Sequence, residues 1–304
     1  MRVGVVILPQ FSAVETRRRW KSLETRGFAH GWTYDHLAWR DLADEPWYST
    51  VPTLATAAAA TSHLRLGTWV TSPNFRHPVT HAKDLMSLDD IAGGELDDFG
   101  KGRIVAAIGA GGLGWDAAVL GRPVLAPKNR VDRLTEFVTL TDLLLTQPET
   151  SWRGDYFVAD RARMHPSGSR DRVRLVVAGN GPRSVRLASA YDGWATTGPE
   201  GVDGADQWWD RLTYLVRIFQ ESVRCRDREG VDRGVDRRTY LSMDAVPGYS
   251  FSSVAAFTAA AGRAQGLGFT DVVIHWPRPT GTYAGDEKVL DGIAELLVGG
   301  EYHC

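Results

Sequence analysis

The sequence predicts a (β/α)8 barrel, and three observations support this fold class. Short apolar runs alternate with longer helical patterns along the chain, which is typical of a parallel sheet covered by helices. The alternation completes eight rounds, the number that closes a barrel. The length of 304 residues is one that α/β barrels reach as a single domain. We therefore expect one barrel domain over residues 1–304, with a doubly wound open sheet as the alternative.

The predicted strands are short, continuous apolar runs of the kind that is buried on both faces of a parallel sheet. The first, Val3 to Leu8, is rich in β-branched residues and stops before Pro9. In order, the expected strands are residues 3–8, 32–34, 64–70, 104–108, 173–178, 193–197, 240–245 and 271–275.

Helical periodicity fills the segments between these strands. It is clearest over residues 128–146, where Leu134, Phe137 and Val138 begin an apolar band opposite charged residues. The expected helices are residues 13–26, 48–61, 78–91, 128–146, 182–190, 205–226, 251–265 and 284–298. Three segments interrupt the alternation: 95–101 and 227–238 are expected to be polar surface insertions, and 152–172 an extended loop.

Composition favours a small-molecule substrate as the binding partner. The 35 Lys and Arg residues and 37 Asp and Glu residues give a net charge of −2 without a block of one sign, so we expect neither nucleic acid nor a membrane surface as a partner. Two cysteines make no disulfide framework, and the N-terminal apolar run is too short for a signal peptide. These features predict a cytoplasmic protein.

The end of the second strand carries the strongest candidate for proton chemistry. Asp35 and His36 lie side by side there, with Trp39 one turn further on. Histidine titrates nearest neutrality and is therefore the natural proton donor or acceptor. The alternative is that Asp35 caps the following segment and His36 hydrogen-bonds a loop.

The next two strands also end in residues that suit a ligand. After Trp69 and Val70, the hydroxyls of Thr71 and Ser72 are able to bind a polar ring edge, although an ordinary polar turn before Pro73 explains them too. The fourth strand opens into a glycine-rich segment that lets backbone approach a flat ligand. Its candidate residues are Gly109, Ala110, Gly111 and, further on, Trp115. The G-x-G-x-x-G spacing there lacks the position and acidic partner of a dinucleotide site.

The fifth strand runs into a turn that resembles a phosphate-binding helix start. Pro182 suits the first helical position, and backbone amides at such a terminus attract anions. The candidate phosphate ligands are Gly179, Asn180, Gly181, Arg183 and Ser184. A plain strand-to-helix turn is the alternative.

A metal site is not expected. The first strand ends in Pro9, Gln10 and Phe11, where a metal-dependent barrel hydrolase would carry an H-x-H pair. His77 and His81 have helical spacing, but no glutamate lies between them as a zincin motif requires.

The order of these motifs resembles that of the luciferase-like flavin- and deazaflavin-dependent oxidoreductases. The resemblance covers residue 1 to about residue 200, whereas the last third fits only by its succession of strands and helices. The quoted segments are Gly27-Phe28, Tyr34-Asp35-His36, residues 66–71, residues 108–111, residues 130–136, residues 177–183 and Asp192-Gly193-Trp194.

The resemblance implies a barrel that binds coenzyme F420, with FMN as the alternative, and a site residue set that matches the candidates above. By analogy, Asp35 contacts the coenzyme, His36 is the proton donor, and a non-prolyl cis bond joins Trp69 to Val70. Gly112 takes the place of an acid that sugar-phosphate dehydrogenases of this group carry, so we do not expect that substrate. Trp39, Trp69 and Trp115 would instead line an apolar or aromatic pocket.

We therefore expect an enzyme that moves hydride between F420 and a small organic substrate. One alternative is an FMNH2-dependent monooxygenase supplied by a separate reductase. An alternative of another class is a flavin-binding barrel without turnover. The resemblance also implies a homodimer.

Overall fold

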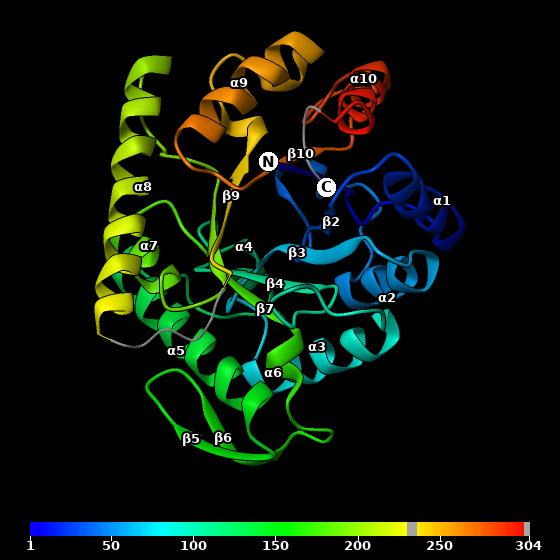
Figure 1. The fold of residues 1–304 in the computed structure, drawn as a ribbon. Helices are drawn as coiled ribbons and strands as arrows, with labels where there is room; N and C mark the ends of the chain where they lie inside the picture. Colours follow the sequence, from blue (N-terminus) through cyan, green and yellow to red (C-terminus); the bar gives the residue numbers. More distant parts are fainter. Residues whose placement is uncertain (230–235, 301–304) are drawn as a thin grey trace. The chain divides into compact units, whose positions relative to one another are not determined.

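The computed structural model describes residues 1–229 and 236–300, and its strands confirm the predicted fold class (Figure 1). Eight strands form one closed barrel in the order β1-β10-β9-β8-β7-β4-β3-β2. Strand β1 pairs in parallel with β10 and β2, β9 with β10 and β8, and β3 with β4. Their bounds are β1 Arg2–Val6, β2 His30–Thr33, β3 Arg65–Thr71, β4 Ile104–Gly109, β7 Arg174–Ala178, β8 Gly193–Thr196, β9 Arg238–Ser242 and β10 Asp271–His275.

Every predicted helix is present, with ends that differ by a few residues. The main helices are α1 Ala13–Thr25, α2 Thr50–Ala60, α3 Pro78–Ala92, α5 Pro127–Thr146, α7 Pro182–Ala188, α8 Ala205–Arg228, α9 Val254–Gly266 and α10 Glu287–Val298. The last helix begins later than predicted because Asp286 caps it, accepting a hydrogen bond from the Lys288 amide. The ninth strand stops at Ser242, since Met243–Ala245 turns into a 3-10 helix.

The chain folds into two compact units whose segments alternate along the sequence. Unit 1 consists of residues 1–8, 18–32 and 177–304, and unit 2 of residues 9–17 and 33–176. One domain over residues 1–304 stays a prediction.

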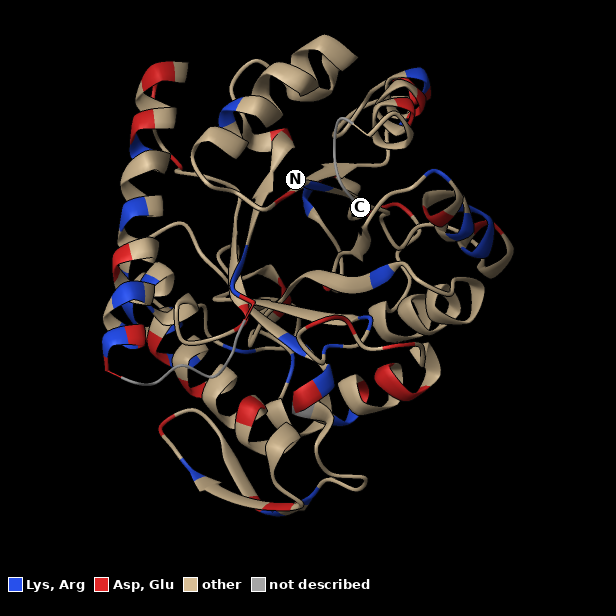
Figure 2. Cartoon of the chain, in the orientation of Figure 1, with Lys and Arg blue, Asp and Glu red and all other residues tan. Residues whose placement is uncertain are grey.

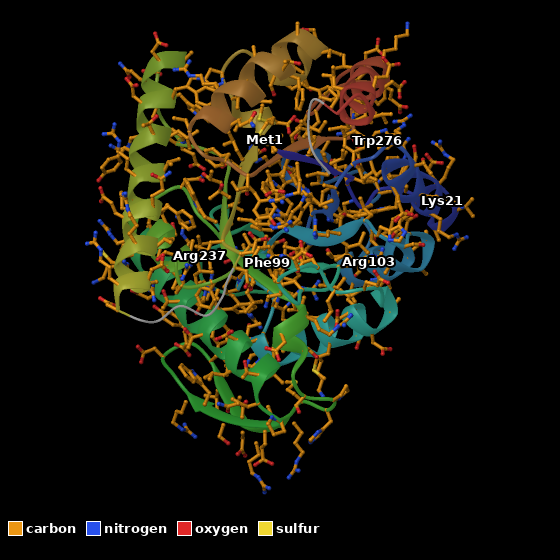
Figure 3. The ribbon with its side chains drawn as sticks, viewed as in Figure 1. Met1, Lys21, Phe99, Arg103, Arg237 and Trp276 are labelled. Carbon is orange, nitrogen blue, oxygen red and sulfur yellow. The ribbon has the colours of Figure 1, made fainter. Side chains whose placement is uncertain are left out.

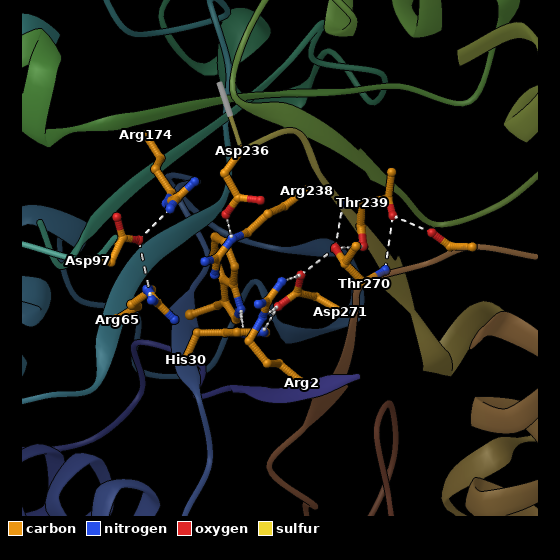
Figure 4. Close-up of polar contacts among 12 residues, drawn as sticks. Arg2, His30, Arg65, Asp97, Arg174, Asp236, Arg238, Thr239, Thr270 and Asp271 are labelled. Atoms are coloured by element: carbon orange, nitrogen blue, oxygen red, sulfur yellow. Dashed lines mark hydrogen bonds and ion pairs between the residues drawn. The ribbon is translucent and has the colours of Figure 1, made fainter. Parts of the chain in front are cut away.

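Unit 1 contains a buried ion network at the beginnings of its strands (Figure 4). The Arg2 guanidinium binds both carboxylate oxygens of Asp271, at 2.8 and 2.9 Å, and His30 lies 3.1 Å from the same carboxylate. Burial raises the pKa of Asp271, but hydrogen bonds from Arg2 and His30 outweigh this and hold it well below its usual range. Trp276, labelled in Figure 3, follows β10, and the guanidinium groups of Arg19 of α1 and of Arg26, just after that helix, lie over its ring, 4.7 and 5.4 Å from the ring centre. In the network of Arg2, His30 and Asp271, each charged group has a partner, so we assign the network a structural role.

In unit 2, helices α2, α3 and α5 pack beside β3 and β4. The insertion at 95–101, predicted as polar surface, has an internal role as well. Asp97 accepts hydrogen bonds from the Phe99 and Lys101 amides and pairs with Arg65 and the buried Arg174 (Figure 4). Although burial raises the pKa of Asp97, its hydrogen bond with Arg174 and its neighbours lower it to about 2. Asp97 therefore anchors two arginines of the strands.

The expected loop at 152–172 is wrong in part. Strands β5 Glu149–Arg153 and β6 Val158–Arg163 form a separate antiparallel sheet, and α6 Ser169–Arg172 follows. Most β6 side chains are exposed, so the segment lacks the apolar alternation by which a half-buried strand is recognised. Glu136 of α5 stabilises the hairpin by accepting hydrogen bonds from the Trp152 indole and the Tyr156 and Phe157 amides.

Charged side chains of both signs are mixed along the helices, as α8 illustrates (Figure 2). Of the expected insertion at 227–238, residues 230–235 lie outside the described residues. Within the described part of the chain, no helix combines the length and apolar character needed to cross a bilayer.

Candidate active site

The residues that follow β2, β3 and β4 bring the central candidates together in unit 2. His36 lies at the centre of this group. Its Nδ1 is 2.7 Å from Oδ2 of Asp116, and the second oxygen of Asp116 accepts a 2.8 Å hydrogen bond from the Leu37 amide. A carboxylate only accepts, so Nδ1 of His36 carries the proton and Nε2 is the position left for proton exchange with a ligand.

This pairing gives His36 a carboxylate partner that the sequence did not indicate. Asp116, and not the adjacent Asp35, fixes the orientation of His36. Gly112 occupies the position of the family's acid after the fourth strand, and Asp116 supplies a carboxylate four residues later. The missed signal was the Asp in the first turn of α4, Trp115–Val119, a short helix that the glycine-rich sequence did not predict.

The carboxylate of Asp35 is paired with side chains of the protein itself. Arg76 binds its two oxygens at 2.7 and 3.2 Å, and the Thr71 hydroxyl donates to it at 2.8 Å. Burial raises the pKa of Asp35, but the Arg76 hydrogen bonds and charge, with Thr71, outweigh it and leave the pKa below its ordinary value. Asp35 is 2% exposed and is an internal anion that holds Arg76 and Thr71, and its expected contact with a coenzyme stays a prediction.

The end of β3 has the predicted backbone. The Trp69–Val70 peptide bond is cis, and the pairing of β3 with β4 shifts register between Thr68 and Thr71. Thr71 and Ser72 are buried, and the Ser72 hydroxyl accepts from the Asn74 amide at 3.4 Å. Contacts of Trp69, Val70, Thr71 and Ser72 with a coenzyme stay predictions.

A contact within the protein explains one glycine of the glycine-rich segment after β4. Gly111 has a φ of 74°, and a Cβ there would lie 2.4 Å from the Asn74 side-chain amide, which donates to the Gly111 carbonyl at 3.2 Å. Arg133 in turn donates to Asn74. Close approach of Asn74 therefore explains Gly111, while the ligand contacts of Gly109 and Ala110 stay untested.

Aromatic rings surround His36. The ring of Trp39 lies 4.5 Å from that of His36, Tyr34 lies 4.9 Å from Trp39, and Trp47 donates to the His36 carbonyl at 2.8 Å. The Nε1 atom of Trp39 is buried and has no hydrogen-bond partner among the described residues. Buried donors are nearly always paired, so this atom suits an acceptor on a bound molecule.

The turn predicted to bind phosphate lies in unit 1 and is held in place by hydrogen bonds among residues of that unit. Asn180 binds Thr197 and accepts from Thr196, both at 2.8 Å, and the Trp194 indole donates to the Gly179 carbonyl at 2.8 Å. The Ser184 hydroxyl is buried and donates to the Gly181 carbonyl at 2.9 Å. Ser184 and Asn180 thus shape the turn, whereas Arg183 is exposed.

A second imidazole–carboxylate pair lies in unit 1 and was missed. His275, the last residue of β10, pairs through Nδ1 with Asp244, and the ring of Tyr283 stacks on it 3.6 Å away and nearly parallel. The two partners come from separate loops, so no local motif revealed them. No group of three or more His, Cys, Asp or Glu side chains within residues 1–229 and 236–300 is arranged to hold a metal ion.

Comparison with known proteins agrees with the barrel and with the motif order. The family described as luciferase-like monooxygenase matches residues 1–245. The chain therefore belongs to the luciferase-like monooxygenase family.

Curated relatives in this family include F420-dependent dehydrogenases. An F420-dependent hydroxymycolic acid dehydrogenase of Mycobacterium tuberculosis (strain ATCC 25618 / H37Rv) is 32% identical over 202 residues, which are 63% of this chain and 51% of that protein. An F420-dependent glucose-6-phosphate dehydrogenase of Intrasporangium calvum is 31% identical over 243 residues, 76% of this chain and 66% of that protein. The chain thus matches between about half and two thirds of the length of these relatives.

The fold has a solved counterpart. An F420-dependent secondary alcohol dehydrogenase in complex with an F420-acetone adduct superposes with a TM-score of 0.75 and 18% identity, covering 98% of each chain. At this identity the likeness establishes the fold.

Proposed function

We propose that this protein is an oxidoreductase that moves a hydride between coenzyme F420 and a small organic alcohol or carbonyl compound. The observation that carries the proposal is the His36–Asp116 pair, a histidine of fixed tautomer within a group of aromatic rings. Family membership and the two F420-dependent relatives support the choice of coenzyme.

The residues of unit 2 fit such a ligand. The buried, unpaired Nε1 atom of Trp39 offers a hydrogen bond, and the rings of Tyr34 and Trp39 offer apolar contact. Bound F420 supplies the position that accepts or gives the hydride. His36 takes up the hydroxyl proton at Nε2 when an alcohol is oxidised and returns it when a carbonyl is reduced. The Asp116 carboxylate stabilises the resulting imidazolium.

In unit 1, we propose that the turn over residues 179–184 binds a phosphate group. The amides at the start of α7 and the exposed Arg183 support this, although Asn180 and Ser184 act by shaping the turn. A homodimer and a cytoplasmic location belong to the same proposal.

The rival is an FMNH2-dependent monooxygenase that draws reduced flavin from a separate reductase. The family's description names a monooxygenase, but the F420-dependent relatives do not favour this alternative. Titrating the purified protein with F420 and with FMN, each oxidised and reduced, separates the two. We expect tight binding of F420 and weak binding of FMN. The reverse preference would select the monooxygenase, and FMN binding without turnover of any substrate would select a storage role.

Replacement of His36 tests the proton-transfer role. His36→Asn should keep the fold and most of the F420 affinity and lower turnover by roughly 10²–10⁴-fold, the usual contribution of one acid–base group. The control is His63→Asn, since His63 is an exposed histidine outside this group of residues. Unchanged turnover in a folded His36→Asn variant would remove His36 from the mechanism.

A further inference from the structure

A cavity of about 180 Å³ lies in unit 1, beside the beginnings of two barrel strands. Its lining comes from α8, from the start of β9 and from the residues just before β10. Asp244 and His275 lie at the carboxyl ends of the same two strands, where barrels gather their catalytic groups. The cavity is therefore at the other end of β9 and β10 from this pair.

The floor of the cavity is apolar. Its side chains are Val216, Phe219 and Phe269, all of them buried. The ring centre of Trp194, a fully buried residue outside the lining, is 5.7 Å from that of Phe219 and 5.7 Å from that of Phe269, so both rings are held in place. An apolar cavity of about 150 Å³ holds a benzene molecule. The cavity thus has room for one ring or a short apolar chain.

Arg237 is the one charged residue among the described residues of the lining (Figure 3). Its Nε atom donates to the Ser189 carbonyl at 3.2 Å and its Nη1 atom to the Asp227 carboxylate at 3.0 Å. Nη2 makes no hydrogen bond to another described residue. The Arg237 side chain is 12% exposed and that of Asp227 is 45% exposed, so water weakens the pairing. Arg237 therefore offers the cavity a fixed, largely buried cation.

Gln220 supplies a second donor at the rim of the cavity. It is exposed, and its amide makes no hydrogen bond to another described residue. Gly268 has a φ of 95°, and a Cβ there would lie 3.4 Å from Nε2 of Gln220. The hydroxyls of Thr239 and Thr270 already donate to the Gly268 carbonyl and to a neighbouring carboxylate (Figure 4). The donors that remain for a ligand are those of Gln220 and Arg237.

We propose that this cavity binds a small monocarboxylate with a single ring or a short apolar chain. The carboxylate accepts hydrogen bonds from Nη2 of Arg237 and from the Gln220 amide, and the apolar part lies against Phe219 and Phe269. A carboxylate is the acceptor that a guanidinium binds most strongly in proteins, whereas a neutral ligand would leave the cation without a counter-charge. Since the ligand contacts both α8 and the start of β9, its binding should also raise the Tm.

Calorimetric titration of the purified protein with benzoate, benzamide and acetate tests the proposal. Benzamide has the ring without the charge, and acetate has the charge without the ring. We expect benzoate to bind at least about tenfold more tightly than either, because only benzoate forms the charge-assisted hydrogen bonds and also covers the apolar floor. The Tm should rise with benzoate concentration.

Two substitutions place the ligand in this cavity. Arg237→Gln should weaken benzoate binding about tenfold or more and leave benzamide nearly unchanged, because the cation is lost. Gln220→Glu should weaken benzoate by a similar factor, since it brings a carboxylate to the binding position, and it serves if Arg237→Gln does not fold. The matched controls are Arg217→Gln and Gln207→Glu, at exposed residues of α8 outside the lining, and neither should change the benzoate constant.

Three results would overturn the proposal. The first is no measurable binding of benzoate, or equal affinities for benzoate and benzamide. The second is unchanged benzoate binding in both Arg237→Gln and Gln220→Glu. The third is loss of benzoate binding in His36→Asn, which would place the ligand at the candidate active site instead. None of these measurements uses F420 or turnover, so their outcome is independent of the proposed function.

Discussion

His36 and Asp116 are 80 positions apart in sequence, yet Nδ1 of His36 lies 2.7 Å from Oδ2 of Asp116. The role of His36 was predicted from its place after the second strand. The identity of its partner was not, because the residue beside it in sequence, Asp35, is turned toward Arg76. Successive side chains after a strand point in different directions, so sequence adjacency is a poor guide to contact.

Asp116→Asn tests whether this carboxylate acts through His36. The amide keeps an oxygen for the Leu37 amide but no longer holds the imidazole in one tautomer, so turnover should fall by about 10²-fold or more with KM little changed. The His36→Asn, Asp116→Asn double variant should be no slower than His36→Asn alone. Asp98→Asn, at an exposed aspartate, is the control. Additive losses would show that Asp116 acts independently of His36.

His81 makes stability depend on pH. It is buried, its Nε2 has no partner among the described residues, and the adjoining cavity of about 10 Å³ has room for about one water molecule. Burial lowers the pKa of His81 to about 4. Its contribution to stability is complete above the unfolded-state pKa near 6.5 and is lost as the pH falls toward 4, a change of about 3 kcal/mol.

Chemical denaturation between pH 7 and pH 4 measures this effect. His81→Leu should flatten the pH dependence of the unfolding free energy, because no proton is then taken up at this position on unfolding. His63→Leu should leave it as in the parent protein. Parallel curves for His81→Leu and the parent would show that His81 is not responsible.

Among the elements, the turn between β7 and α7 contains residues that hold its conformation and a different residue that we propose binds phosphate. Asn180 and Ser184 are bonded within unit 1, and Arg183 is the exposed cation at the start of α7. Arg183→Glu should therefore weaken the binding of phosphorylated coenzyme by about tenfold or more and leave its phosphate-free analogue nearly unchanged. Arg186→Glu, at an exposed arginine later in α7, is the control. Equal losses for both ligands would contradict a phosphate contact.

The strands and helices also show which elements can be predicted from the sequence pattern. The eight barrel strands and their helices were recognisable because a strand buried on both faces has a continuous apolar sequence and a covering helix has one apolar stripe. Strands β5 and β6 were missed because exposed strands carry no such pattern. Helix α4 was missed because five residues after a glycine run are too few to show a helical period.

For the whole molecule, we propose that residues 1–304 unfold as one domain. Unit 1 is assembled from three separate chain segments and unit 2 from two, so neither is a contiguous piece that is complete before the rest of the chain. Scanning calorimetry should give a single transition whose calorimetric and van't Hoff enthalpies agree. Far-ultraviolet circular dichroism and tryptophan fluorescence should change together. Two resolved transitions would contradict a single domain.

The sequence by itself determined the barrel, the order of its elements and the position of His36 after the second strand, and the family resemblance implied the cis Trp69–Val70 bond. These follow from local patterns and from motif order, which are written along the chain. The tertiary structure decided which carboxylate serves His36, that Asp35 is an internal anion, and that α8 and the segment before β10 line one cavity. Such contacts join residues tens of positions apart, and only the folded chain sets their distances and burial.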